Sequence, residues 1–207
     1  MRVVVEHLEE CLSPWLMSEY SYVVKLFGEK VVFTNVRSSQ IRDALRRLGA
    51  STTELSIVDL VTVGEVVNPI VLDPKARETL QPEDLEKADA VVIGGIMGEH
   101  PPRGRTYREI TSRLAQRALS RNIGKYQLTI AGAAYVLKRV SEGYRLELLD
   151  IRFGLRFTTT VGGYEITVEL PYAFPYEGAK PVLPEDYLEI IARKSLLYES
   201  KPACVEE

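Results

Sequence analysis

The feature that most restricts the fold of this chain is the short apolar run from Ala90 to Ile93. Three of its four residues are β-branched, which favours a strand covered on both faces by other parts of the protein. Gly94 and Gly95 follow directly, and a charged loop with two prolines then extends to Thr106. Because strands buried on both faces occur in parallel sheets with helices on each side, the run predicts an α/β fold.

Predicted strands and helices alternate along most of the chain. Ser13 followed by Pro14 is a typical helix start, and Gly28 a typical end. The segment Ser51 to Asn68 fits either a short helix or a strand. Such alternation is typical of a parallel-sheet α/β domain. The expected strands are 2–6, 31–35, 69–72, 90–93 and 119–123, and the expected helices are 14–27, 39–48, 83–87, 106–119 and 129–140.

The C-terminal part has a different character. Tyr144 to Leu170 is rich in β-branched and aromatic residues and contains a Gly162-Gly163 turn signal, which predicts strands joined by a hairpin. A proline- and aromatic-rich crossing segment is expected for 171–184, followed by a final helix to about residue 198. We expect one domain over 1–207, with the β-rich segment 144–183 packed on or near the rest.

Composition and charge exclude several classes. The net charge of −3 and pI near 5.6 argue against tight nonspecific binding to nucleic acid. No apolar run is long enough to span a membrane, and no signal peptide is recognisable, so we expect a cytoplasmic protein. Sparse amide residues and abundant Arg and Glu favour a thermophile. Cys11 and Cys204 match no metal spacing and are expected to be two thiols, or a disulfide in a hyperthermophile.

Three predicted loops leave strands of the same sheet, at 72–77, 94–106 and 122–129. Each contains glycine or proline together with polar residues. In open α/β sheets, ligands bind beyond the carboxyl ends of the strands, so these loops are expected to converge on one small ligand. None has the spacing of a phosphate-binding or dinucleotide-binding loop, and no metal-ligand spacing is present.

Several stretches of this chain match the motifs of one known family. They are Glu6-His7-x-Glu9-Glu10 with Ser13-x-Trp15, Leu72-Asp73-Pro74, Leu80-Gln81-Pro82-Glu83-Asp84, the loop from Gly94 to Thr106, and Lys180-Pro181-Val182-Leu183-Pro184-Glu185. In these residues the chain resembles the SPOUT methyltransferase superfamily, in the branch that contains a fungal methyltransferase for an arginine of a ribosomal protein. The segment 157–175 is longer and more β-like than that resemblance leads us to expect.

The resemblance implies a parallel-sheet SPOUT-like fold with a C-terminal trefoil knot, and S-adenosylmethionine held bent among the knot loops. It implies a ribosomal protein as substrate, and either a monomer or a homodimer. The residues expected to bind the cofactor are Leu72, Asp73, Gly94, Gly95, Ile96, Gly98, Glu99, His100, Pro101, Ile123, Gly124, Tyr126, Gln127 and Leu128. Asp73 has a second interpretation, as the cap of a helix that starts at Pro74.

The chemistry of an arginine substrate requires a carboxylate. A guanidinium is protonated at neutral pH, so a carboxylate is needed to hold its N–H groups and to accept charge. Glu99 is the first candidate by position, unless it only pairs with Arg103 or Arg105, and Glu19 is the second. His100 is either a proton acceptor or a donor that fixes the loop.

The expected substrate contacts are Arg103, Arg105, Trp15 and Tyr20, although a tryptophan at the position of Trp15 is more often part of the core. An acidic set, Glu6, Glu9, Glu10 and Glu19, would suit a basic peptide. Two alternatives stay open. Arg113 and Arg117 share one face of the expected helix, and Arg121 is expected at or beyond its end. These arginines form either a solvated face or a contact to ribosomal or transfer RNA, which would favour an RNA methyltransferase. The other alternative is a knotted ligand-binding protein without catalysis.

Overall fold

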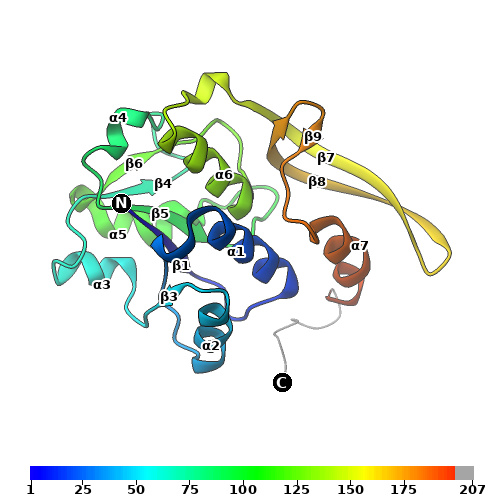
Figure 1. Ribbon diagram of the computed structural model, residues 1–207, viewed down its shortest axis with the longest axis horizontal. Helices are drawn as coiled ribbons and strands as arrows, with labels where there is room; N and C mark the ends of the chain where they lie inside the picture. Colours follow the sequence, from blue (N-terminus) through cyan, green and yellow to red (C-terminus); the bar gives the residue numbers. More distant parts are fainter. Residues whose placement is uncertain (199–207) are drawn as a thin grey trace.

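The computed structural model describes residues 1–198, with the backbone alone for 193–198 (Figure 1). Its centre is a six-stranded sheet in the order β3-β2-β1-β5-β4-β6, in which every neighbouring pair is parallel. The predicted parallel α/β fold is therefore confirmed. The strands are β1 (Arg2–His7), β2 (Val31–Thr34), β3 (Ser51–Thr52), β4 (Pro69–Leu72), β5 (Ala90–Gly95) and β6 (Leu119–Arg121).

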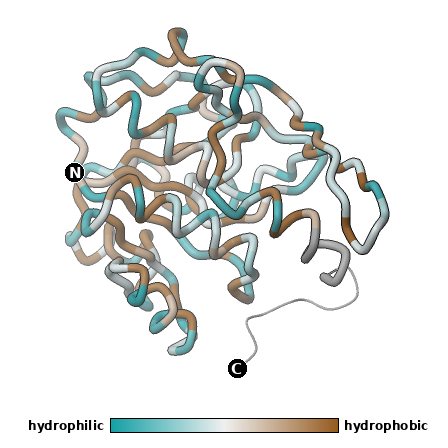
Figure 2. The backbone as a smooth tube through the Cα atoms, turned by 45° about the vertical axis from the view of Figure 1, so that its right-hand side comes forward, coloured by the Kyte–Doolittle hydropathy of each residue, from teal (hydrophilic) through white to brown (hydrophobic). Residues whose placement is uncertain are grey.

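The strands are apolar throughout because each face of the sheet has its own core. Val3 and Val5 pack into one core and Val4 into the other, and Val91 and Val92 divide in the same way. Helices α1 (Pro14–Phe27), α2 (Ser39–Arg47) and α6 (Ile130–Ser141) contribute to the first core. Helices α3 (Ile57–Thr62) and α5 (Ser112–Leu114) contribute to the second. Segments of hydrophobic residues accordingly pass through the middle of the molecule, as the brown parts of the tube in Figure 2 show.

The helices begin where the sequence supplies caps. The side chains of Ser13, Ser38, Ser56 and Thr129 each accept a backbone N–H from the first turn of the helix that follows. The ambiguous segment 51–68 contains both a short strand, β3, and a short helix, α3. The α-helices are α1 (Pro14–Phe27), α2 (Ser39–Arg47), α3 (Ile57–Thr62), α4 (Pro82–Leu85), α5 (Ser112–Leu114), α6 (Ile130–Ser141) and α7 (Tyr187–Tyr198).

The helix expected over 106–119 is not regular. A π-helical turn, η2 (Tyr107–Thr111), precedes the short α5, and a 3-10 turn, η3 (Ala115–Arg117), ends it. Within this wider turn Ile110 is fully buried, while the hydroxyl of Thr111 donates to Asp73. The prediction of one α-helix was wrong because these tertiary contacts outweigh the regular helical pattern.

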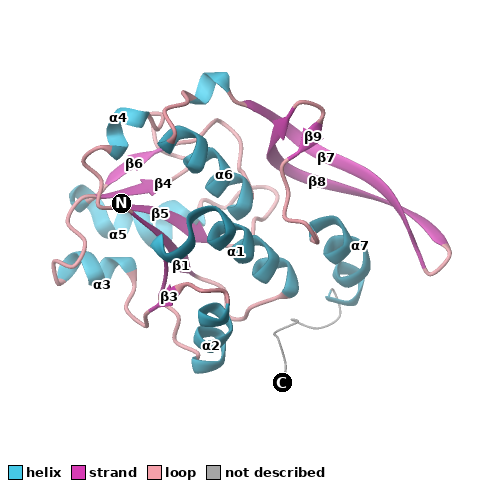
Figure 3. Ribbon diagram, viewed as in Figure 1, coloured by secondary structure: helices cyan, strands magenta, loops and turns pink. Residues whose placement is uncertain are grey.

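The C-terminal part forms a second sheet, which projects from the body as a long hairpin (Figure 3). It consists of β7 (Asp150–Val161), β8 (Tyr164–Glu177) and β9 (Lys180–Pro181), all antiparallel. The turn at Gly162-Gly163 was predicted, but the strand was expected to end before Pro171. It continues because Pro171 lies in the irregular stretch between the pairs Phe153–Ala173 and Leu155–Leu170, where no ladder bond requires its N–H.

Two further expectations concern membrane spans and the two cysteines. None of the helices described is both long and apolar enough to cross a membrane. Cys204 lies outside the described residues, so the pairing of Cys11 and Cys204 stays untested.

Candidate functional site

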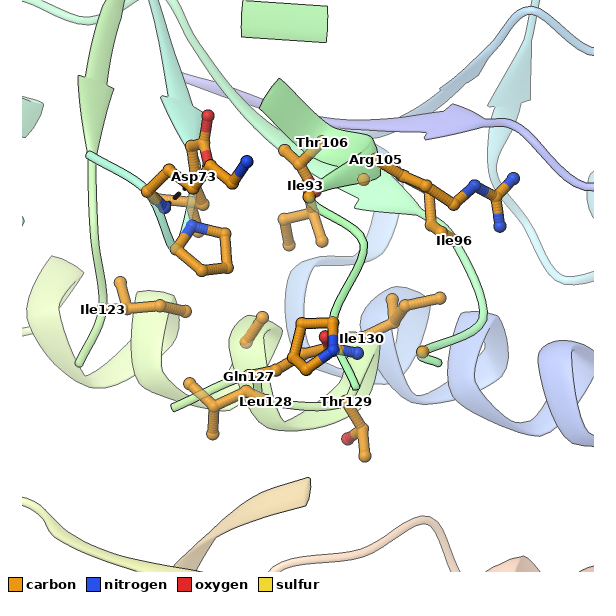
Figure 4. Close-up of a pocket in the computed structure, with 18 of the residues that line it drawn as sticks. Asp73, Ile93, Ile96, Arg105, Thr106, Ile123, Gln127, Leu128, Thr129 and Ile130 are labelled. Atoms are coloured by element: carbon orange, nitrogen blue, oxygen red, sulfur yellow. Dashed lines mark hydrogen bonds between the residues drawn. The ribbon is translucent and has the colours of Figure 1, made fainter. Parts of the chain in front are cut away.

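The main cavity lies where β4, β5 and β6 end, and it is lined by the three loops that follow these strands (Figure 4). Its volume is about 150 Å³. The predicted convergence of the three loops on one site is thus what the fold produces. Ile93, Ile123 and Leu128 supply apolar walls, and Gln127 and Thr129 add polar groups.

Most of the residues expected to bind a cofactor line this cavity. They are Leu72, Asp73, Gly94, Ile96, Gly98, Glu99, Ile123, Gly124, Tyr126, Gln127 and Leu128. Other residues that line it were not among the expected cofactor contacts, among them Lys75, Thr106, Ile130 and Ala133.

Three expected cofactor residues lie elsewhere. Gly95 faces the core: a Cβ at this position would lie 2.7 Å from the carbonyl oxygen of Glu6 and would also meet the hydroxyl of Tyr20. His100 and Pro101 are exposed and do not line the cavity. Gly95 therefore lets β5 pack closely on its neighbours.

Asp73 shapes the first of the three loops. Its Oδ1 accepts the backbone N–H of Lys75 at 2.8 Å, and its Oδ2 accepts the hydroxyl of Thr111 at 2.6 Å. The side chain is buried. Asp73 thus fixes a turn and joins it to η2 while lining the cavity. No helix begins at Pro74, so its expected role as a helix cap was wrong.

Glu9 holds both ends of the loop that follows β5. Its Oε1 accepts the backbone N–H of Met97 at 2.9 Å and the guanidinium of Arg105 at 2.7 Å. Arg105 also donates to the carbonyl of Leu8 at 3.0 Å. The structure thereby gives Arg105 a bound, loop-fixing position, and Glu9 a role that sequence reasoning did not find.

A second, smaller cavity of about 20 Å³ lies beside the first. The two share the lining residues Ile96, Met97, Gly98, Leu128, Thr129 and Ile130. Trp15 and Glu19 of α1 and Tyr172 of β8 complete the smaller one. Of the candidate carboxylates, Glu19 is the one that lines this smaller cavity.

The carboxylate of Glu19 is buried at the N-terminus of α6. It accepts the backbone N–H of Ala131 at 2.5 Å. Burial raises the pKa of Glu19 to about 7, while this N–H, Tyr187, Trp15 and Thr129 favour the ionised form. A carboxyl group that titrates near neutral pH is suited to accept a proton.

Glu99 is in the paired state that the sequence reasoning kept as its second interpretation. Its Oε2 lies 2.7 Å from Nε of Arg103, and the side chains of Glu99 and Arg103 are 39% and 74% exposed. An exposed ion pair of this kind contributes little stability, although Oε2 itself is screened from solvent. Glu99 lines only the larger cavity.

Tyr20 lies in the core and does not face either cavity. It is fully buried, and its hydroxyl is 2.9 Å from Nδ1 of His7. Burial lowers the pKa of His7 to about 4, so this histidine is neutral at physiological pH. The structure gives no support to the expected substrate contact of Tyr20, because this residue lies on the face of α1 that packs on the sheet.

Tyr172 and Tyr187 are site residues that sequence reasoning missed. The hydroxyl of Tyr172 donates to the carbonyl of Gly98 at 2.8 Å, which ties the hairpin to the cavity loop. Tyr187 is fully buried and stacks edge-on against Trp15, with ring centroids 5.9 Å apart. Nothing local in the sequence signals that either residue returns to α1.

The burial and pairing of charged residues bear on two predicted surface patterns, the acidic set and the row of arginines. Glu6 is buried and accepts the hydroxyl of Thr34 and the backbone N–H of Ile57, so it adds nothing to an acidic surface. Arg121 is bound by both oxygens of Asp84, each at 2.9 Å. As expected, Arg121 lies beyond the end of the helix, in β6, while Arg113 and Arg117 are exposed, which fits both a solvated face and an RNA contact.

Comparisons with known proteins agree with this geometry. The family described as protein arginine N-methyltransferase SFM1-like matches residues 2–197. Protein arginine N-methyltransferase SFM1 of Saccharomyces cerevisiae is 32% identical over 211 residues, which cover 94% of this chain and 96% of that protein.

Solved structures show the same relationship. The yeast arginine methyltransferase SFM1 complexed with SAM is 28% identical with a TM-score of 0.81, covering 92% of this chain and 89% of that chain. Its complex with SAH is 27% identical with the same TM-score, covering 92% and 94%. The dual specific Trm10 from Thermococcus kodakaraensis, 14% identical with a TM-score of 0.54 over 71% and 96%, shares the fold. The chain belongs to the SFM1-like family of protein arginine N-methyltransferases, as its resemblance to SPOUT methyltransferases implied.

Proposed function

We propose that this protein transfers a methyl group from S-adenosylmethionine to an arginine of a protein substrate. The observation that carries the proposal is the cavity at the ends of β4, β5 and β6, in a chain that matches SFM1 structures complexed with SAM and SAH over most of its length. Its family is that of protein arginine methyltransferases.

The residues around the main cavity fit this cofactor. Ile93, Ile123 and Leu128 would pack on the adenine and ribose, and the backbone of the loops offers hydrogen-bonding groups. Gly98 lets the loop after β5 pack closely on two other lining residues, because a Cβ there would meet the amide of Gln127 and lie 2.6 Å from Cε1 of Tyr172. When bound, the cofactor supplies an electrophilic methyl group on a sulfonium.

The protein's own contribution is positioning and proton removal. Methyl transfer requires an in-line nucleophile in a water-poor site, and we place that nucleophile in the smaller cavity beside the buried Glu19. Glu19 is the candidate that we favour as proton acceptor because it is buried there, whereas Glu99 is paired and half-exposed and His100 is exposed. We assign Trp15 to the substrate side of the site and Arg105 to the support of the cofactor loop.

The finer proposal concerns substrate and organisation. The motif resemblance supports a ribosomal protein as the methylated partner, in the cytoplasm, and a single domain over 1–207 whose C-terminal sheet part is knotted. It leaves a monomer and a homodimer as the two proposed states. The bound position of Arg121 removes one argument for RNA as substrate.

Calorimetric titration with S-adenosylmethionine and S-adenosylhomocysteine tests the cofactor site. We expect dissociation constants near 1 μM, about −8 kcal/mol, and their loss on Gly94→Leu, which fills the cavity, with the circular dichroism spectrum unchanged. Absence of binding to both compounds at millimolar concentration would refute the proposal.

The substrate is tested with S-adenosylmethionine labelled in its methyl group. Small-subunit ribosomal proteins and ribosomal RNA are incubated separately with the enzyme, and the labelled product is hydrolysed and identified. We expect methylarginine from the protein fraction. Label in nucleotides alone would establish the RNA alternative.

A further inference from the structure

One edge of strand β8 is covered only over its C-terminal part. β9 pairs with its last two residues, and the carbonyl oxygen of Pro175 accepts the backbone N–H of Val182 at 2.8 Å. The N–H of Ala173 donates to the carbonyl oxygen of Gln127, also at 2.8 Å. Over 164–171, no backbone group of the part of the chain that the structure describes pairs with this edge. This stretch is the open edge of β8.

The open edge directs unused hydrogen-bonding groups away from the hairpin. The turn at 162–163 has positive φ at both glycines, which is the type I′ geometry in which the two flanking residues form a hydrogen-bonded pair. Because such pairs alternate along an antiparallel ladder, the backbone N–H and C=O groups of Glu165, Thr167 and Glu169 point outward. The side chains of these three residues are exposed.

The open edge leads toward the two cavities. It ends at Ala173, which is covered by Gln127 and Leu128, and both of these line the main cavity. Tyr172, just before it, lines the smaller one. At about 3.3 Å per residue, Glu169 lies about 10 Å along the strand from Tyr172. An extended chain paired with the open edge would bring its neighbouring residues to the cavities, while the far end of the hairpin extends beyond the helices (Figure 3).

The charge of β8 indicates what kind of chain would pair with it. The strand contains Glu165, Glu169 and Glu177 and no basic residue. Glu169 lies 3.4 Å from Arg156 of β7, but the two side chains are 70% and 73% exposed, so this pair is weak. Natural edge strands are usually protected by lysine, proline or a covering segment, and the sequence of 164–170 has neither residue. Two copies of this edge would repel each other, whereas a basic segment would complement it.

We propose that the open edge of β8 binds an extended, basic segment of the protein substrate as an added strand and so guides the arginine to the cavities. The inference rests on the proposed methyl transfer to a protein, and it adds where the backbone of that protein is held. Main-chain hydrogen bonds supply the affinity, and Glu165 and Glu169 favour basic side chains. The methylated arginine should lie about three or more residues outside the paired segment, since Glu169 and Tyr172 are separated by that length of strand.

Two proline variants of the full-length protein form a matched test. Thr167 and Thr158 lie opposite each other, with their hydroxyl oxygens 3.1 Å apart, so both substitutions disturb the same cross-strand pair. Thr167→Pro removes an N–H from the open edge of β8, whereas Thr158→Pro removes one from the outer edge of β7. With small-subunit ribosomal proteins and labelled S-adenosylmethionine, we expect Thr167→Pro to raise the apparent KM about tenfold and to keep kcat within about twofold, and Thr158→Pro to behave as wild type.

A second variant leaves every backbone group in place. Glu165→Gln combined with Glu169→Gln should raise the apparent KM about fivefold and weaken its dependence on salt, because the attraction of a basic segment is lost. Glu86→Gln combined with Glu147→Gln removes two exposed carboxylates outside the hairpin and is the control. This pair of variants decides the question if Thr167→Pro does not fold.

Hydrogen exchange of the wild-type protein detects the added strand directly. In the presence of S-adenosylhomocysteine, addition of the ribosomal proteins should slow exchange at the amides of Glu165, Thr167 and Glu169. The amides of Thr158 and Thr160 on the other edge of the hairpin should be unaffected.

Three results would overturn the inference. They are equal effects of Thr167→Pro and Thr158→Pro on KM, methylation of ribosomal proteins without protection of the β8 amides, and protection that grows with enzyme concentration alone, which would identify a second copy as the occupant. A wild-type protein that binds S-adenosylhomocysteine but methylates no ribosomal protein is a different result. It would refute the proposed substrate, and the inference that rests on it would fall as well.

Discussion

The contact between Glu9 and the loop that follows β5 allows a quantitative prediction. One carboxylate oxygen accepts both the N–H of Met97 and the guanidinium of Arg105, at opposite ends of the loop after β5. Hydrogen bonds to charged groups contribute about 1.5–3 kcal/mol each, but both side chains are about one-fifth exposed, so water screens part of that energy. Glu9→Gln keeps the size and loses the charge.

We therefore expect Glu9→Gln to cost about 1.5 kcal/mol in holding the loop closed, which weakens S-adenosylhomocysteine binding by roughly tenfold because fewer molecules have a formed cavity. The assay is calorimetric titration. Glu10→Gln, an exposed neighbour, is the control and should bind as wild type. Arg105→Gln should weaken binding similarly, and the double variant by less than the sum. A dissociation constant within twofold of wild type for Glu9→Gln would refute the reasoning.

Two further predictions concern stability. Gly95→Ala should lower the free energy of unfolding by about 2 kcal/mol in thermal denaturation, because its Cβ would overlap the carbonyl of Glu6. Gly94→Ala should cost much less, because the nearest atoms to its Cβ would lie at 3.2 and 3.3 Å. Equal losses for the two variants would contradict the packing argument. Arg121 lowers the pKa of Asp84 by hydrogen bonding, so this pair stabilises the fold above the ordinary carboxyl pKa and loses its effect as pH falls through the lower folded value. Asp84→Asn should thus cost about 2 kcal/mol at pH 7 and much less near pH 3 by urea denaturation, and a pH-independent difference would exclude the ion pair as the cause.

Prediction from sequence succeeded where the signal was local. The β-branched runs and serine caps located β1, β2, β4 and β5 and most helices within a few residues. The rule that ligands bind at the carboxyl ends of parallel strands brought Asp73, Gly94 and Gln127 to one cavity. Gly95 was misassigned because the two glycines are equivalent in sequence, and only the pleat of β5 turns one toward the cavity and the other toward α1.

The parallel sheet, the hairpin and the three loops could be predicted from the sequence. Their signals are the periodicity of hydrophobic residues, helix caps and turn residues, which all act over a few neighbouring positions. Only the tertiary structure shows which carboxylate is buried beside the two cavities. Glu99 and Glu19 are alike in sequence terms, but Glu19 is buried by Ala131, Tyr172 and Tyr187, which lie more than a hundred residues away along the chain. Burial, and with it the affinity of a carboxylate for protons, depends on everything that excludes water from it, and no local pattern records that.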